Sequence, residues 1–379
     1  MFPAAFLCTV VDATPPTPNL FPSSVAPIAS SEDPDDPWKR LKVTADGRVR
    51  AEGTFDQVNG EDRIRGRLRF RLSADYQIAD GLKAGTRFTT VSDGRDANNP
   101  HWDFGDADGF SATQVGIDRL FLEWKPESSW TLTGGKFAHV YTRPSPVREL
   151  AWDDDVQPAG VAAVWAPKAD GDVSFDVRGI YGVATEINSQ TGSGADPSVL
   201  GAQANVYVKT SESTTITLAS SYSAWSSLRN FDFAGSNQGN TLDNGGFAIW
   251  DTYLGLALAG EGFSQVTAFG QYFNNLDDDT GEDTGYAAGV QLGHTKGKGN
   301  WNVFGAYYDL DANAVFSAVA QDDTPIAGTG LGAGMSGFMA GVQYFVLENV
   351  SLRLWGLTSD ADASEDPYRI RFDIDFRIP

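Results

Sequence analysis

Residues 63–76 read RIRGRLRFRLSADY, the most regular pattern in the chain. From Arg63 to Arg71 every second residue is an arginine, and the residues between and after them are mostly apolar up to Tyr76. Because successive side chains of a β-strand point to opposite faces, this alternation predicts a strand with one charged face and one apolar face. Neighbouring arginines on the charged face would lie about 7 Å apart and would repel each other by roughly 0.6 kcal/mol in water.

The free-energy cost of placing charge in lipid decides which side of the barrel this charged face lies on. On the lipid side of a membrane barrel each arginine would cost about 2–4 kcal/mol near the midplane, whereas a wet lumen with counter-charges tolerates the row. We therefore expect the arginines to face the inside of a barrel. One interpretation is that they only pair with acids on neighbouring strands and stiffen the wall. The other is that they also act on the solutes that pass.

The same alternation continues along most of the chain. It is clearest, besides the first stretch, in residues 41–55 and 368–378. Weaker segments of this kind lie at residues 82–92, 114–124, 130–138, 159–166, 173–183, 200–210, 214–224, 246–258, 263–273, 284–294, 300–309, 336–346 and 350–358. Most are long enough for the about 9–11 tilted residues with which a strand crosses a bilayer. The sequence thus predicts an all-β fold, a transmembrane antiparallel β-barrel of about 16 strands.

The connections between these segments alternate between short and long. The short ones carry turn residues such as Asp80 and Gly81. The long ones lie at residues 93–113, 139–158, 184–199, 225–245, 274–283, 310–335 and 359–367, and the first of their class, 56–62, is shorter. Membrane barrels show this asymmetry, with tight periplasmic turns and long external loops. A soluble propeller gives no reason for it, and no blade-length repeat is present.

An even number of strands would place both ends of the barrel in the periplasm. Aromatic residues near the strand ends are expected to form girdles at the membrane interfaces. These residues are Trp124, Trp130, Trp165, Tyr222 and Trp301.

The composition of the chain narrows the class of protein further. The chain has 379 residues and a formal charge of −22, which argues against nucleic acid as a partner. No run of about 18 apolar residues occurs, so the sequence offers no transmembrane helix. Two parts are expected: residues 1–37, an apolar segment followed by a disordered Pro/Ser/Asp-rich linker, and residues 38–379, the barrel. Because residues 1–11 lack a basic start, the apolar segment is either the remnant of a signal peptide or an artefact of the start site.

Closure of the barrel brings further basic residues beside the first arginine row. In a closed barrel the last strand lies next to the first, so the inward residues of the end strands share one side of the lumen. Alternation alone then predicts a basic wall. Its expected pore-lining residues are Arg48, Arg50, Arg63, Arg65, Arg67, Arg69, Arg71, Lys83, Arg87, Arg119, Arg353, Arg369 and Arg371.

The long connection at residues 139–158 is the acidic counterpart of that wall. Its acidic residues are Glu149, Asp153, Asp154 and Asp155. One interpretation is an ordinary solvated loop. The sharper one is a loop folded into the lumen, anchored by the Trp152 indole and stiffened by prolines, whose carboxylates narrow the pore opposite the arginines.

Nothing in the sequence indicates a catalytic or metal centre, and we expect no cofactor. The three histidines, His101, His139 and His294, lack the spacing of a metal site, and no Gly-x-Ser-x-Gly motif is present. The acidic run from Asp277 to Asp283 lacks the ordered ligand spacing of a calcium loop and is interpreted as solvated surface.

Three further motifs follow one another in the first half of the chain. Residues 117–124 read IDRLFLEW, residues 134–137 read GGKF, and residues 152–161 read WDDDVQPAGV. This order of strand, short turn, GKF strand and acidic loop resembles the putative porin family of Gram-negative outer membranes, over roughly residues 38–379. The resemblance implies a diffusion porin of about sixteen strands in the outer membrane of a Gram-negative bacterium, and a homotrimer as in general porins.

A lumen of that size predicts passive diffusion of small hydrophilic solutes and ions through a barrel surrounded by outer-membrane lipid. The longer row of arginines favours anions. Two other functions stay open. An outer-membrane enzyme, such as a phospholipase or protease, would need a nucleophile or an acid–base pair at the rim, and the scarcity of histidine speaks against it. A structural or adhesive barrel would show no conductance.

Overall fold

The structure of the 379-residue chain is a computed structural model. It describes residues 37–56, 61–91, 101–104, 113–143, 147, 149–184, 186, 195–228, 239–241, 247–259, 265–321, 323–324, 332–360 and 366–379. Arg40–Pro379 forms one compact unit. The N-terminal part expected at residues 1–37 falls almost wholly outside the described residues, apart from the start of a short 3₁₀ helix, η1 (Pro37–Arg40). The described part of the chain contains no helix with the length and apolar character that crossing a membrane requires.

Seventeen strands of the larger unit form one sheet. Their bounds are β1 (Leu41–Phe55), β2 (Arg63–Ala79), β3 (Leu82–Val91), β4 (Trp102–Asp103), β5 (Gln114–Trp124), β6 (Trp130–Lys136), β7 (Ala159–Trp165), β8 (Val173–Val183), β9 (Ser198–Ser211), β10 (Thr214–Ser226), β11 (Phe247–Leu258), β12 (Val266–Asn275), β13 (Thr284–Gly293), β14 (Trp301–Leu310), β15 (Met335–Leu347), β16 (Val350–Thr358) and β17 (Tyr368–Ile378). The two-residue β4 pairs with β2 only, and β3 pairs directly with β5.

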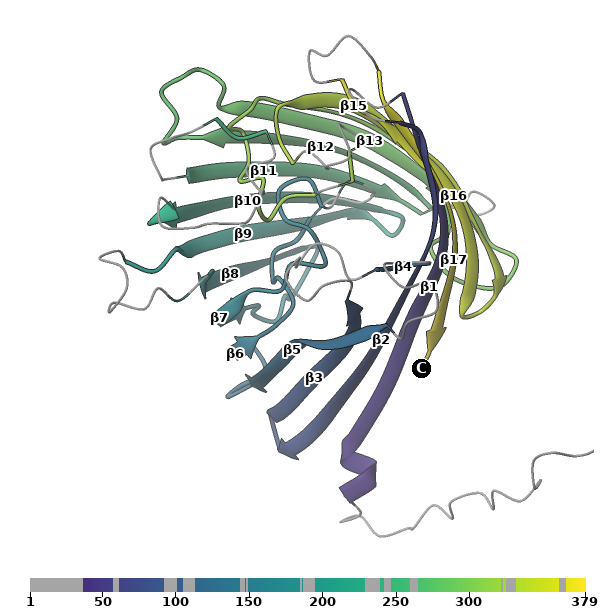
Figure 1. Cartoon of the computed structure of the whole chain (residues 1–379). Coiled ribbons are helices and arrows are strands. Elements are labelled where there is room, and N and C mark those ends of the chain that lie inside the picture. The colour runs from purple at the N-terminus through teal and green to yellow at the C-terminus, as the bar shows by residue number, and fades with distance from the viewer. Residues whose placement is uncertain are drawn as a thin grey trace, which may run out of the picture. The chain divides into compact units, whose positions relative to one another are not determined.

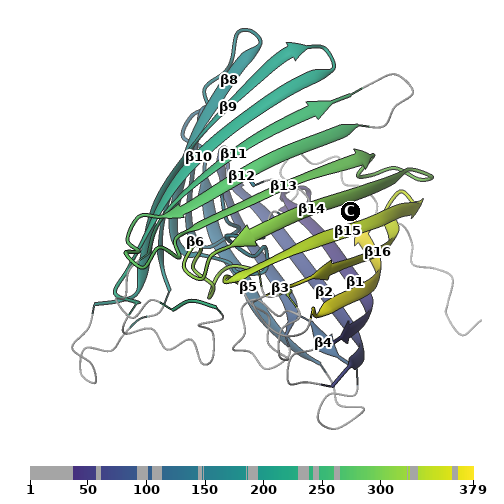
Figure 2. The ribbon, with the colours of Figure 1, turned by 90° about the horizontal axis from the view of Figure 1, so that it is seen from above.

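The other sixteen strands close into a barrel (Figures 1 and 2). Each pairs antiparallel with the next along the chain, and β1 pairs with both β2 and β17. The prediction of an all-β antiparallel barrel of about 16 strands is therefore confirmed. Because no edge strand is left open in such a sheet, its backbone donors and acceptors are paired around the whole circumference.

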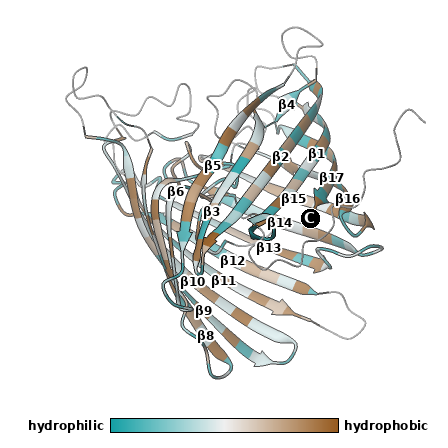
Figure 3. Ribbon diagram, turned by 90° about the horizontal axis from the view of Figure 1, so that it is seen from below, coloured by the Kyte–Doolittle hydropathy of each residue, from teal (hydrophilic) through white to brown (hydrophobic). Residues whose placement is uncertain are grey.

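The two faces of the barrel wall carry different side chains, as the sequence alternation requires. On β2 the apolar Ile64 is 80% exposed on the outside, whereas Arg67 is 4% exposed and lines the interior. Large apolar side chains recur on the outside of distant strands, for example Leu200 on β9 and Leu254 on β11, and brown and teal alternate along the strands in Figure 3. An apolar outer surface suits lipid, and a polar inner face suits water.

Short and long connections alternate along the chain, and antiparallel pairing gathers each kind at one rim of the barrel. The turn from β2 to β3 needs glycine at Gly81, where φ is +70° and the carbonyl oxygen of Lys125 lies 2.5 Å from the site of a Cβ. β1 begins and β17 ends at this short-turn rim. The expected girdle residues at the same rim are Trp124, Trp130, Trp165 and Trp301, while Tyr222 lies towards the other end of its strand. Their contact with a membrane interface stays a prediction.

Two long connections fold inward and fill part of the lumen. Leu150, from the connection between β6 and β7, joins Val315, from that between β14 and β15, in a buried cluster with Phe273 of β12. A second cluster brings Trp152 and Phe316 of the same two connections together. Burying such a side chain stabilises the fold by about 1.5–3 kcal/mol. These contacts fix the two connections against the inner faces of β9 to β15, and a cavity remains beside β1, β2, β16 and β17.

Candidate functional site

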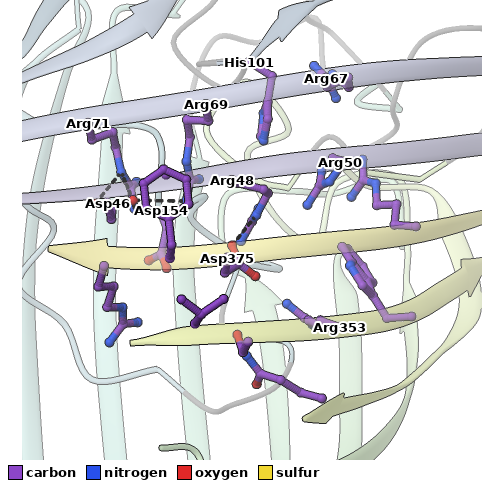
Figure 4. Close-up of a pocket in the computed structure, with 18 of the residues that line it drawn as sticks. Asp46, Arg48, Arg50, Arg67, Arg69, Arg71, His101, Asp154, Arg353 and Asp375 are labelled. Carbon is purple, nitrogen blue, oxygen red and sulfur yellow. Dashed lines mark hydrogen bonds and ion pairs between the residues drawn. The ribbon is translucent and has the colours of Figure 1, made fainter. Parts of the chain in front are cut away.

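The inward side chains of β1, β2, β16 and β17 form one basic surface, which we call the arginine wall. These strands are neighbours because β16 pairs with β17, β17 with β1, and β1 with β2. The members of the wall are Arg48, Arg50, Arg63, Arg65, Arg67, Arg69, Arg71, Arg353, Arg369 and Arg371, and all of them line one cavity of about 1050 Å³. Figure 4 shows several of them projecting into it. The structure thus brings together the basic residues that the sequence predicts on these four strands.

The cavity follows the wall for much of its height. Its lining extends from Thr44 and Glu348, near the short-turn rim, to Thr54 and Arg63, near the long-loop rim. Ten residue steps along a strand correspond to about 33 Å. Glu149 of the inward connection also lines this cavity.

Three predicted members of the wall, on β3 and β5, do not line this cavity: Lys83, Arg87 and Arg119. Acids of β5 neutralise two of them. The Lys83 Nζ lies 3.4 Å from a carboxylate oxygen of Glu123, and the Arg87 Nε donates to Asp118 at 2.9 Å. The prediction of a pore-lining role is therefore not supported by the position of these three residues.

Arg119 shows why simple alternation fails on β5. The pairing of β3 with β5 shifts register at Arg87, and Ile117 and Leu120 are both exposed on the outside although they are three residues apart. A β-bulge therefore puts Asp118 and Arg119 together on the inside. There the Arg119 Nε donates to Gln157 of the inward connection at 2.7 Å.

Carboxylates on the wall strands themselves neutralise much of the arginine wall. Arg371 and Glu52, each only 1% exposed, approach to 2.5 Å, and Arg50 lies 2.7 Å from Asp373. Charge-assisted pairs of this kind hold buried guanidinium groups in one geometry. The pairing expected from the sequence is present, and it leaves some arginines better neutralised than others.

A further carboxylate that neutralises the arginine wall comes from a segment whose position the sequence did not predict. Residues 101–104 fold back onto β2, where Asp103 of β4 lies opposite Arg67. Its carboxylate is 2.9 Å from Arg65 and 2.7 Å from Arg67. The available signal was the pattern Trp-Asp-Phe at 102–104, which repeats the apolar and charged alternation of the wall inside an otherwise polar loop. The remainder of the loop at residues 92–100 and 105–112 lies outside the described residues.

The Asp155 carboxylate, in the connection at residues 139–158, contacts the arginine wall directly. The Asp155 oxygens lie 3.2 Å from the Nη1 of Arg71 and 3.5 Å from the Nη1 of Arg69. Asp154 instead pairs with Arg143 of its own connection at 2.5 Å. The Asp153 carboxylate accepts a hydrogen bond from the backbone N–H of Asp155 at 2.6 Å. All three consecutive aspartates line the cavity; Asp155 contacts the wall, and Asp153 and Asp154 also order the connection.

Trp152 holds this connection in place. Its side chain is 7% exposed, stacks on Trp225 with ring centroids 5.5 Å apart, and lies 4.2 Å from the ring of His139. The indole Nε1 donates to the carbonyl oxygen of Val156 at 2.9 Å. The geometry agrees with an anchoring role for this indole.

A second inward connection, between β14 and β15, also contacts the arginine wall. Asp323, between β14 and β15, lies 2.7 Å from Arg371. The sequence prediction treated residues 310–335 as an external loop, which was wrong for the described part. Residues 312–320 read ANAVFSAVA, and this mostly apolar run was the signal that the loop is buried.

Two ionisable groups outside the strands have shifted pKa values because they lie in the interior of the barrel. Burial, together with Asp154 and Asp323, raises the pKa of Glu149 to about 7. Burial and the nearby Arg50 lower the pKa of His101 well below its usual value, so its imidazole is neutral at pH 7. Among the residues that the structure describes, no group of three or more His, Cys, Asp or Glu is placed to hold a metal ion.

Solved structures share this architecture, a closed barrel with a polar cavity inside. OprB from Pseudomonas putida, in its high-pH structure, is 10% identical; the match covers 90% of this chain and 95% of that one, with a TM-score of 0.60. OmpF of Salmonella typhi, in complex with daunomycin, is 12% identical; the match covers 89% of this chain and 97% of that one, with a TM-score of 0.52. At such low identity the likeness concerns the fold, which is that of a porin-type barrel channel.

The family comparison agrees with the fold. Residues 37–244 match the model of the family described as "Putative porin". The match covers more than half of the chain, and the chain belongs to the putative porin family. No curated protein matches the sequence.

Proposed function

We propose that the chain is a channel rather than an enzyme, a porin through which small hydrophilic solutes and ions diffuse passively. The observation that carries this proposal is the cavity of about 1050 Å³ that follows the arginine wall from Thr44 to Thr54 inside a closed barrel. Its lining is rich in charged side chains, which keep water and ions in the lumen. The apolar outer face supports a place in lipid, here the outer membrane of a Gram-negative bacterium.

The narrowest section is proposed where the connection at residues 139–158 meets the wall. Asp155 reaches Arg71 and Arg69, so the connection crosses the lumen and solutes pass beside this contact. Arginines on one side and the acids of the connection, Glu149 among them, on the other would create a transverse field. The field would orient polar solutes, and the larger number of arginines would favour anions.

The assembly is proposed to be a homotrimer. Gly255 of β11 faces inward under the ring of Tyr253, and Gly341 of β15 faces inward towards Phe304, so these two glycines do not lie at a contact between copies. An apolar groove on the outside of β5 to β9, where Val161 lies exposed, is the better candidate for a contact between copies. Mass measurement in mild detergent should give three chains per particle; a monomer alone would contradict the proposal.

The channel proposal is tested with the purified chain in a planar lipid bilayer. We expect stepwise increases in current, each step a single channel whose conductance rises in proportion to KCl concentration, as for a water-filled pore. The same preparation unfolded by heat is the control and should give no steps. A folded barrel that inserts into the bilayer without conducting would contradict the proposal and favour a structural or adhesive role.

A further inference from the structure

Two pairs of like charges face each other on the arginine wall. In the register of β1 and β2, Arg48 lies opposite Arg69 and Arg50 lies opposite Arg67. We call these four residues the arginine quartet. Side chains at such positions have Cβ atoms about 4.5–5.5 Å apart, and like charges there destabilise the pair unless negative charge lies beside them.

The protein supplies that negative charge unevenly. Three members of the quartet each have a carboxylate oxygen at 2.7 Å, from Asp375, Asp373 and Asp103. The fourth, Arg69, has only longer contacts, 3.5 Å to Asp155 and 3.6 Å to Asp46. Its Nε is buried and has no hydrogen-bond partner among the residues that the structure describes. Burying a donor without a hydrogen-bond partner costs about 1–3 kcal/mol. An acceptor atom on a ligand would offset this cost.

His101 adds an unpartnered polar group at the same place. Figure 4 shows its ring beside Arg69 and above Arg48 and Arg50. The side chain is 5% exposed, lines the cavity, and its Nε2 has no hydrogen-bond partner in the described part of the chain. Two buried nitrogens without a partner in the described part of the chain therefore lie beside the quartet, on residues that line the cavity.

Arg353, on β16 of the same wall and two strands from β1, adds further positive charge. Its guanidinium lies 4.5 Å from the ring centroid of Trp355 and 4.8 Å from that of Phe304, and among the described residues it makes no ion pair with a carboxylate. Stacking on aromatic rings holds a guanidinium in place without neutralising it. Its charge is available to a solute.

We propose that the arginine quartet and His101 form a binding site for a phosphate group, carried as free phosphate or on a small organic molecule that enters the lumen. The proposal rests on the proposed function only in that the ligand arrives through the pore. The donors come from β1, β2 and the segment at residue 101 and therefore do not share one plane. A planar carboxylate is matched by one guanidinium fork, whereas a tetrahedral phosphate accepts hydrogen bonds from several directions.

Charge gives the second reason for phosphate. A phosphate monoester carries about −1.5 to −2 at pH 7. It therefore offsets the repulsion within the quartet more than a halide does. A halide offers one acceptor atom, whereas phosphate offers two oxygens to the two parallel N–H groups of a guanidinium fork.

The test is a blocking experiment on the full chain in a planar bilayer. Inorganic phosphate, added to a KCl solution at constant ionic strength, should lower the chloride current along a saturating curve. Glycerol phosphate in a second arm distinguishes the sources: block by both ligands assigns the site to the phosphate group on either, and block by inorganic phosphate alone assigns it to the free anion. Equal block by succinate at equal concentration would overturn the phosphate assignment.

Two variants distinguish a specific phosphate site from a general attraction of anions by the positive lumen. Arg69→Lys keeps the charge but removes the fork and the Nε, and should raise the half-blocking concentration about tenfold with little change of the KCl reversal potential. Lys125→Gln removes one positive charge elsewhere, at a turn residue whose side chain is 55% exposed. Phosphate should block this variant at the same half-blocking concentration as the wild type. Equal block in Arg69→Lys and wild type would overturn the site. If Arg69→Lys does not fold, His101→Gln takes its place with the same expected direction.

The outcome for the site is separable from the outcome for the channel. A conducting channel without saturable block overturns the site and leaves the porin function standing. Calorimetric titration of inorganic phosphate into the folded chain in detergent needs no current. Heat of saturable binding that weakens in Arg69→Lys supports the site even if no channel forms, and its absence in the wild type overturns it.

Discussion

Trp152 shows how one side chain controls the interior of this barrel. Its indole joins a stack with Trp225 and His139 and so fixes the connection that carries Asp155. We expect Trp152→Ala to lower the free energy of unfolding by about 3–5 kcal/mol, because it empties a buried aromatic site. Denaturant unfolding in detergent measures this loss. Single-channel current should also become noisier, because Asp155 is no longer held against the wall.

The matched control for that change is another tryptophan. Trp124 ends β5 at the short-turn rim and is half exposed on the outside. Trp124→Ala should leave current noise unchanged and lower stability by a smaller amount. Equal noise in the two variants would contradict the anchoring role of Trp152.

Glu149 gives the channel a dependence on pH. Its pKa is raised to about 7 from 4.5, so the folded state holds a proton that the unfolded chain has already lost at neutral pH. The stability that this group contributes is complete below about pH 4.5 and is lost as pH rises through about 7. In the same window the lumen gains a negative charge, so anion preference should fall as pH rises.

Reversal potentials in a KCl gradient between about pH 5.5 and 8.5 measure this effect. Glu149→Gln should flatten the change, because the amide cannot titrate. His101 contributes nothing over this range, because its lowered pKa keeps it neutral. An unchanged pH profile in Glu149→Gln would show that another group is responsible.

Among the elements, the strands were predictable, and the sharper of two interpretations placed the connection at residues 139–158 in the lumen, whereas the inward course of the connection between β14 and β15 was not predicted. Period-2 alternation located the barrel strands closely, since lipid on one side and water on the other impose it on every strand. Connections carry no such period, and β4 and residues 311–324 were missed for that reason. The bulge on β5 was missed because one extra residue reverses the faces of a strand without altering its composition.

The packing of β4 onto β2 leads to a prediction at this level. Asp103 contacts both Arg65 and Arg67, which also contact Glu52, so Asp103→Asn should loosen residues 101–104 and lower the free energy of unfolding by about 1–3 kcal/mol. Urea unfolding in detergent measures the loss. Asp170→Asn, at an exposed turn, is the control and should change stability by less than about 0.5 kcal/mol. An equal effect of the two substitutions would contradict the docking of β4 by charge.

For the molecule as a whole, the alternation of connections predicts its orientation. A peptide tag inserted in the long connection at residues 184–197 should react with a membrane-impermeant reagent on intact cells, and a tag in the turn at residues 166–172 should not. The connection at residues 310–335 is a poor place for a tag, because its described part is packed inside the barrel. Labelling of the turn with a silent long connection would reverse the proposed topology.

The most direct measurement is the reversal potential of paired charge variants under a KCl gradient at low salt. Replacing Asp153, Asp154 and Asp155 by Asn should raise anion preference, and replacing Arg67 and Arg69 by Gln should lower it, because the two sets carry opposite charges and line the same cavity. Both effects should shrink in high salt, where ions screen the lumen. Opposite shifts in two folded variants would support a pore governed by the arginine wall and the connection that faces it. Unchanged reversal potentials in both would contradict it.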